Sequence, residues 1–379
     1  MTDAREDLQR RTYVMTVLGL SLVLAGCDRA PPPPPPSPTP PAAPVRADTP
    51  TARGIGGREV VLDVDTTSDT RSYVLGFAPP GYVAVLAGER YVEYDTATGA
   101  RGRSLPLLQR LQPASLRVPT AWGGDIDAEG SRVAVAFEGA VALYDLPSGV
   151  RRWLREGVRA DLLRLVGDEV VVASSREVLR LDATDGAVRV RWALPNPLLT
   201  AAQLKALARS ASSAEAVMRA LEVVTPVVAL SRNGARFAIG SSSAVVFDTA
   251  TGEPVSVHAL EVPVRSPQSE RCLNAIALDD HDLVVLAYEG GTVRFERGSV
   301  LVEVRVNGFP RVATDATGRR IAASGGVRSV TVGPTMQAPT LPLLAGPGFR
   351  SLNAPVFLSA DGRICAALSR QRLVLWTIP

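Results

Sequence analysis

A short turn recurs along this chain, and each copy follows a strand rich in valine. The clearest copy is residues 247–253, Phe-Asp-Thr-Ala-Thr-Gly-Glu, and the four copies begin at Asp95, Asp145, Asp182 and Asp248. Aspartate can accept hydrogen bonds from the backbone amides of such a turn, threonine or serine adds a local bond, and glycine adopts positive φ without steric cost. We therefore expect these aspartates to cap turns in an all-β repeat architecture.

The apolar segments between these turns fall into regular groups. Residues 73–344 hold six successive groups of four strands, and residues 355–378 hold a seventh group of only three. A spare strand at 58–65 would supply the missing outer strand, because its apolar residues alternate. Closing the ring in this way removes an exposed sheet edge and ties the termini together. The sequence predicts a seven-bladed β-propeller over residues 56–379, with six or eight blades as open alternatives.

Two kinds of turn resemble those of known propeller families. The turns at 231–236, 315–319 and 359–363 resemble the Ser-x-Asp-Gly-Arg turn of WD-repeat-like propellers, and residues 373–376 resemble their closing strand. The Asp-x-x-Thr-Gly turns resemble those of quinoprotein-type propellers. In that family a tryptophan four residues after the turn glycine packs between blades. Trp153 follows Gly149 at this spacing, whereas Trp192 lies six residues after Gly186 and departs from it.

One segment interrupts the strand pattern between the third and fourth groups. Thr200 with Gln203, and Ser212 with Glu215, have the spacing of two successive helix capping boxes. The sequence therefore predicts a helical hairpin inserted near residues 198–222.

The N-terminal residues have the features of an export signal. Two arginines precede an apolar run that is short for a membrane span and ends in Leu24-Ala25-Gly26-Cys27. This ending resembles the lipobox of bacterial lipoproteins, which implies a signal peptide at 1–26 and a lipid on Cys27. An ordinary secretory signal is the alternative. Residues 27–55 contain the proline tract 31–36 and are expected to form an extended, disordered spacer rather than a ligand for a partner domain.

Composition narrows the chemistry that the chain can perform. The 41 basic and 38 acidic residues leave a net charge of only +3, which argues against a nucleic-acid surface. Three scattered cysteines and two separate histidines form no zinc motif. We expect His258 on the surface, the acidic run 279–282 in a tight turn, and Cys365 buried and separate from Cys272. The sequence identifies no catalytic, cofactor or metal residue.

Loop lengths suggest where binding could occur. The long connections are 106–121, 195–224, 261–272 and 344–352, and in a propeller they all lie on the face opposite the tight Asp turns. Long loops on a rigid scaffold often bind partners, although insertions are also tolerated there without function. We expect a non-enzymatic, monomeric lipoprotein scaffold of the bacterial cell envelope, at the inner or outer membrane, with protein partners.

Its layout of anchor, linker and propeller resembles that of the propeller lipoprotein in the outer-membrane β-barrel assembly machinery. Two other functions stay open. The Asp-x-x-Thr-Gly turns resemble those of dehydrogenases that use pyrroloquinoline quinone and calcium, but the adjacent cysteines and calcium cluster typical of that class are missing from this sequence. A ligand-binding or carbohydrate-binding sensor in the propeller channel is the third possibility.

Overall fold

Seven four-stranded or five-stranded sheets make up the described part of the chain, which contains strands and no helix. In the computed structural model, the described residues are 55–62, 72–78, 81–88, 90–107, 121–137, 139–194, 226–241, 243–259, 272–306, 310–324, 329–337, 339, 341–345, 349, 354–369 and 371–379. Within these ranges no helix is long and apolar enough to cross a membrane.

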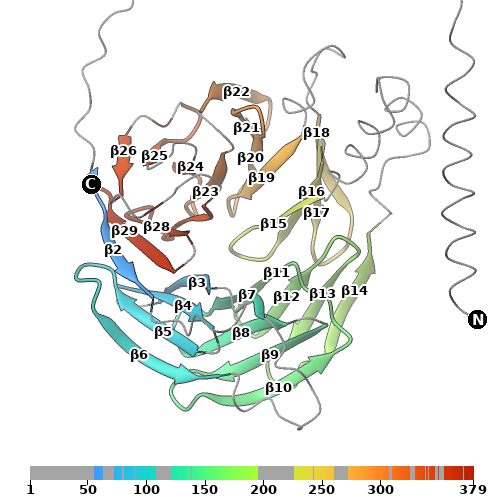
Figure 1. The fold of residues 1–379 in the computed structure, drawn as a ribbon. Coiled ribbons are helices and arrows are strands. Elements are labelled where there is room, and N and C mark those ends of the chain that lie inside the picture. Colours follow the sequence, from blue (N-terminus) through green and yellow to red (C-terminus); the bar gives the residue numbers. More distant parts are fainter. Residues whose placement is uncertain are drawn as a thin grey trace, which may run out of the picture. The chain divides into compact units, whose positions relative to one another are not determined.

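The sheets are the blades of a propeller, arranged in a ring in chain order (Figure 1). Blade I contains β3 (Ser72–Ala78), β4 (Tyr82–Ala87), β5 (Arg90–Asp95) and β6 (Arg101–Pro106). Blade II contains β7 (Ala121–Ile126), β8 (Arg132–Phe137), β9 (Ala140–Asp145) and β10 (Val150–Glu156). Blade III contains β11 (Leu162–Val166), β12 (Glu169–Ala173), β13 (Glu177–Asp182) and β14 (Val188–Ala193).

The remaining blades continue the same antiparallel order. Blade IV contains β15 (Val227–Leu230), β16 (Arg236–Gly240), β17 (Ser243–Asp248) and β18 (Pro254–Ala259). Blade V contains β19 (Leu273–Leu278), β20 (Leu283–Tyr288), β21 (Thr292–Arg297) and β22 (Val300–Arg305). Blade VI contains β23 (Arg311–Thr314), β24 (Arg320–Ser324), β25 (Ser329–Pro334) and β26 (Leu341–Leu344), and blade VII contains β27 (Val356–Leu358), β28 (Ile364–Ser369) and β29 (Arg372–Thr377).

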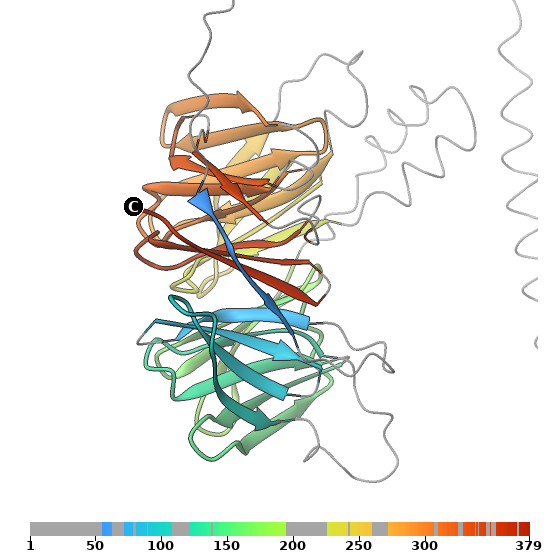
Figure 2. The ribbon, with the colours of Figure 1, turned by 60° about the vertical axis from the view of Figure 1, so that its left-hand side comes forward.

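Residues 55–61, which we call the closure segment, join the two ends of the chain. Its second part, β2 (Arg58–Val61), pairs antiparallel with β29 and becomes the outer strand of blade VII. The predicted seven blades and the predicted closure by an N-terminal strand are therefore confirmed, with the strand observed as far as Val61. Its first part, β1 (Ile55–Gly56), adds in parallel to β26 of blade VI, a fifth strand that the sequence pattern does not predict. Figure 2 shows the closure segment, in blue, crossing the red strands of blade VII.

The core lies between the faces of neighbouring blades. The middle strands of a blade are covered on both faces, so they read as continuous apolar runs, as in β20, where all six side chains are buried. Between blades II and III, for example, Val141 and Leu143 pack with Val170, Leu179 and other apolar side chains. Each blade interface is a separate cluster of this kind, which makes the ring rigid.

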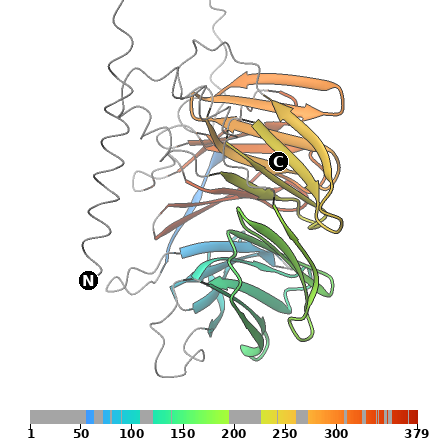
Figure 3. The same ribbon diagram turned by 90° about the vertical axis from the view of Figure 1, so that its right-hand side faces the viewer.

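The two faces of the ring differ in the connections they carry. The turns between the first and second and between the third and fourth strands of each blade lie on one side, which we call the turn face. Figure 3 shows such turns of blade III in green and blade IV in yellow at the same side of the ring. The turns between the second and third strands, and the connections from each outer strand to the next blade, lie on the opposite side, the loop face. The predicted signal peptide, Cys27, the helical hairpin near 198–222 and the linker up to residue 54 lie outside the described residues and stay predictions, whereas Ile55, the last residue of the predicted linker, belongs to β1.

Candidate functional site

Three of the four recurring aspartates cap their turns as expected. Oδ1 of Asp248 accepts hydrogen bonds from the amides of Ala250 (2.9 Å) and Thr251 (3.1 Å). Asp95 and Asp182 each accept a bond from the amide two residues further on. In Asp182, this bond and those from Arg189 hold the pKa of the carboxyl below its ordinary value. These carboxylates are therefore occupied by the turn itself.

Asp145 is the exception, because the residue two positions after it is Pro147. Proline has no amide hydrogen, so the bond made by the other three aspartates has no donor here. The Asp145 carboxylate instead accepts a 2.6 Å bond from Nε of Arg152 on β10. The expectation of a fourth amide-capping aspartate was wrong for this reason, although Gly149 still closes the turn with positive φ.

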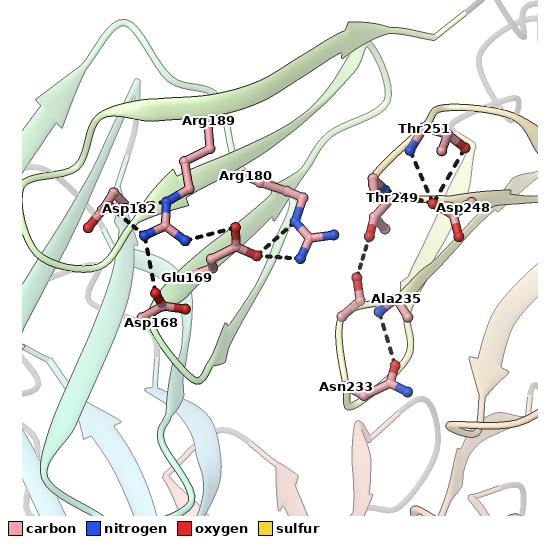
Figure 4. Close-up of polar contacts among 12 residues, drawn as sticks. Asp168, Glu169, Arg180, Asp182, Arg189, Asn233, Ala235, Asp248, Thr249 and Thr251 are labelled. Atoms are coloured by element: carbon pink, nitrogen blue, oxygen red, sulfur yellow. Dashed lines mark hydrogen bonds and ion pairs between the residues drawn. The ribbon is translucent and has the colours of Figure 1, made fainter.

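An ionic network ties the strands of blade III together at the turn face (Figure 4). The Arg189 guanidinium bonds to Asp182 at 2.5 Å, to Glu169 at 3.1 Å and to Asp168 at 3.2 Å. Arg180 adds a second ion pair to Glu169. The bonds to Asp182, Asp168 and Glu169 raise the pKa of Arg189 above its ordinary value. Each of the three carboxylates of this network is paired with an arginine, so none of the three is left open to a metal.

Two tryptophans join blades by resting on the turn glycines of the next blade. Trp153 donates a 3.1 Å bond from Nε1 to the carbonyl oxygen of Ala183, and a Cβ on Gly186 would lie 2.9 Å from its ring. Trp192 makes the same contact with the turn of blade IV, where a Cβ on Gly252 would lie 3.0 Å from its ring. The expectation that Trp153 packs between blades is confirmed. Trp192 does so too, despite its departure from the family spacing.

Arginines of three blades bond to the first turn of the next blade around the turn face. Arg132 of blade II donates a 2.6 Å bond to the carbonyl oxygen of Gly167 in blade III. Two analogous bonds run from Arg297 of blade V to blade VI, at 3.1 Å, and from Arg320 of blade VI to blade VII, at 3.2 Å. These long side chains thus serve the ring and are not displayed for a ligand.

A charged group lies between the inner strands of the ring. Arg164 of β11 reaches within 3.5 Å of Asp125 on β7, whose other oxygen accepts a 2.9 Å bond from the Leu165 amide. Burial raises the pKa of Asp125 even though Arg164 opposes the shift. Arg232, from the first turn of blade IV, lies near this pair. Burial, and then the charge of Arg164, lower the pKa of Arg232 below its ordinary value. No sequence pattern indicates this group, because its members come from three blades.

His258 is buried, which overturns its expected surface position. Only 9% of it is exposed, and its ring bonds to Glu296 of blade V and to Ser256 on its own strand. The side of β18 that carries the His258 side chain therefore faces blade V and not solvent. The error arose because an outer strand was assumed to have a free face.

The acidic run 279–282 forms the tight turn expected of it. Asp279 is 1% exposed and accepts bonds from the amides of His281 and Leu283 and from Arg297. Among the described residues, no group of three or more His, Cys, Asp or Glu side chains is arranged to hold a metal ion. Cys365 is fully buried and bonded to no other cysteine, as predicted, and burial raises the pKa of its thiol.

The loop face is the remaining candidate surface. Its connections differ widely in length, from the five residues 157–161 to the segment 194–226 between β14 and β15. The turn face, by contrast, consists of tight turns whose polar groups bond to one another. The geometry therefore places the connections of widely different length on one side of the ring.

The fold defines the class of protein, a seven-bladed β-propeller, and comparisons with solved structures agree. A chain in the "Crystal Structure of Mitotic Checkpoint Complex" is similar at TM-score 0.59 and 12% identity, covering 94% of this chain and 99% of that one. The Cps50 (Swd1) propeller of Myceliophteria thermophila is similar at TM-score 0.56 and 16% identity, covering 85% and 100%. BamB from Moraxella catarrhalis is similar at TM-score 0.52 and 14% identity, covering 86% and 100%.

These likenesses are in fold alone, because the identities are low. No protein-family model matches the sequence, and no curated protein matches it.

Proposed function

We propose that this chain is a lipid-anchored protein of the bacterial cell envelope whose propeller is a scaffold for protein contacts, with the partner bound at the loop face. The observation that carries the proposal is the contrast between the two faces. On the turn face, carboxylates such as Asp248 and Asp279 are satisfied by their own turns. On the loop face, the long connections begin and end at rigid strands, which is the arrangement that suits binding loops.

The similar structures support a binding role. One of them is part of a checkpoint complex of several proteins by its name, and propellers of this kind commonly present loops to partners. Asp279, the first residue of the acidic run 279–282, accepts hydrogen bonds from two backbone amides and from Arg297, so it is already engaged as a ligand candidate for calcium. The quinone-dependent dehydrogenase is therefore the weaker proposal.

The anchor rests on the N-terminal sequence. Cys27 follows an apolar run and Leu-Ala-Gly, and residues 28–54 would then link the lipid to β1. Mass spectrometry of the N-terminal peptide from envelopes should find a lipid on Cys27, and Cys27→Ser should release the protein into the soluble fraction. An unmodified Cys27 in a membrane-free protein would refute the anchor while leaving the scaffold open.

The scaffold is tested by affinity purification of the tagged full chain from detergent-solubilised envelopes. We expect specific co-purifying proteins with the wild-type chain and their loss when residues 198–222 are deleted. Glu253→Arg, a charge reversal at an exposed position of the turn face, is the matched control and should keep them. A folded deletion variant that retains every partner would show that this loop is not the binding element.

A further inference from the structure

Three side chains form a hydrogen-bonded chain at the rim between blades IV and V. The hydroxyl of Ser256 lies 2.8 Å from Nε2 of His258, and Nδ1 of His258 bonds to Oε2 of Glu296. On the far side of the carboxylate, Nε of Arg294 lies 2.5 Å from Oε1. The sequence separates Glu296 from His258 by 38 residues, so only the packing of the two blades brings them together.

The strand register explains how this arrangement is held. Ser256 and His258 are two residues apart on β18, so both side chains point to the same side, toward blade V. His258 lies opposite Ala244 on β17, and that small side chain leaves room for the imidazole. Glu296 lies opposite Leu301 on β22, and Leu301 is 49% exposed. The three groups are therefore positioned by strands, which fix side chains more firmly than loops.

The order of the three groups determines which atom donates and which atom accepts in each hydrogen bond. An ionised Glu296 can only accept, so the neutral imidazole places its hydrogen on Nδ1 and donates it to the carboxylate. Nε2 is then the acceptor for the Ser256 hydroxyl. His258 is 9% exposed and the Glu296 side chain 13%, whereas Ser256 is only half-buried. The His258–Glu296 pair is therefore shielded from water, and Ser256 is the partly exposed member of the three.

We propose that Ser256 is a nucleophile that accepts acyl groups from small esters. A hydroxyl bonded to a base that is oriented by a carboxylate is the recurring arrangement for such activation, and it is recognised by geometry on any fold. Oγ of Ser256 would form a bond to the acyl carbon as its proton passes to Nε2 of His258. That proton then goes to the departing alkoxide when the ester's carbon–oxygen bond breaks.

The proposal is independent of the loop-face scaffold and is tested on the full chain with a fluorophosphonate probe and with p-nitrophenyl acetate. We expect the probe to be found on Ser256 by peptide mapping, and a burst of p-nitrophenol of about one equivalent. Ser256→Ala should abolish both signals while keeping the His258–Glu296 pair. His258→Gln should slow labelling about 100-fold or more, the usual contribution of a general base, and Glu296→Gln should slow it less.

Ser104 provides the matched control. It lies on β6, the outer strand of blade I, is also half-buried, and bonds to Arg90 and Arg101 instead of a histidine. Ser104→Ala should leave labelling unchanged. Labelling absent from Ser256 in folded wild-type protein would overturn the proposal and leave the three residues as a link between blades. Labelling of folded His258→Gln as fast as that of the wild type would overturn it as well.

Discussion

Arg232 of blade IV donates a hydrogen bond of 2.9 Å from Nη2 to the carbonyl oxygen of Leu358 in blade VII. The bond spans the central region of the ring and joins blades that are not neighbours. A chain of turn-to-turn bonds runs beside it, from Asn233 to Asp280 at 2.7 Å and onward through Ala316 to Ala360. The first turns of blades IV to VII are thus held as one unit.

Arg232→Ala should lower the free energy of unfolding by about 1–3 kcal/mol, the range for losing a hydrogen bond from a charged group. Urea denaturation measures the change. Arg159→Ala is the control, because the Arg159 side chain is 60% exposed and its ion pair with Asp161 is long, at 3.5 Å. That variant should lose about 0.5 kcal/mol or less. Equal stability of both variants would show that the bond across the ring contributes nothing.

Gly186→Ala and Gly167→Ala separate backbone strain from packing. Both glycines have positive φ, 74° and 58°, so alanine is strained at each. Only at Gly186 would the added Cβ also meet the Trp153 ring, at 2.9 Å, whereas nothing lies within 4 Å at Gly167. We expect about 1–2 kcal/mol of destabilisation at Gly167 and a further 1–3 kcal/mol, roughly, at Gly186. Thermal unfolding of the two variants measures the difference between their stabilities. This difference would vanish if the Trp153 ring can move aside freely.

Gly57→Ala should weaken the closure of the ring. A Cβ there would lie 2.3 Å from Nε1 of Trp376 and 2.5 Å from Val374, and the Gly57 amide bonds to Leu344 at 2.7 Å. At Gly56 nothing lies within 4 Å. We therefore expect Gly57→Ala to lower the free energy of unfolding by about 1–3 kcal/mol. Proteolysis within the closure segment should also become faster. Gly56→Ala should behave like the wild type in both assays.

Asp248→Asn should destabilise the protein at neutral pH and not in acid. Burial raises the pKa of Asp248, but the bonds from Thr251 and Ala250 and the charge of Arg236 outweigh it, so the folded-state pKa lies below 3.8. The ionised carboxylate therefore stabilises the fold above pH 3.8, and this contribution is lost as pH falls through the lowered pKa. Urea titrations at pH 7 should show that Asp248→Asn lowers the free energy of unfolding by about 1 kcal/mol relative to the wild type. This difference should shrink below pH 4. A deficit independent of pH would contradict the assignment.

Cys365 should not react with a thiol reagent in the folded protein. It is 0% exposed, and burial raises the pKa of the thiol, so the reactive thiolate is scarce. In a background with Cys27→Ser and Cys272→Ser, labelling of Cys365 should appear only with denaturant and follow the unfolding of blade VII. Rapid labelling in buffer alone would show that this blade opens in the native state.

Features that repeat along the chain were predictable from the sequence. The valine-rich strands, the glycines of the turns and the spare strand at Arg58 each obey local rules, and together they define the seven blades. The sequence also explains why Asp145 does not accept a bond from the amide two residues further on, because the residue at that position is Pro147. The position of Cys365 followed from the apolar run around it.

Several features that depend on contacts between blades were not predictable. Trp192 docks on Gly252 because of where blade IV lies, and no spacing within β14 indicates it. The pairing of His258 with Glu296 likewise depends on two strands meeting across a blade interface. β1 has only two residues, so it has no periodicity to detect, and its parallel pairing depends on the exposed edge of β26.

The closure segment has a mechanical consequence for a chain held at its N-terminus. β1 and β2 are separated only by Gly57, yet they pair with different blades. Tension arriving through the residues before Ile55 is borne first by β1 on blade VI and by the Gly57–Leu344 bond. The strand that completes blade VII is loaded only after these give way. In the anchored form proposed above, such tension would therefore act on blade VI before it could open the ring at blade VII.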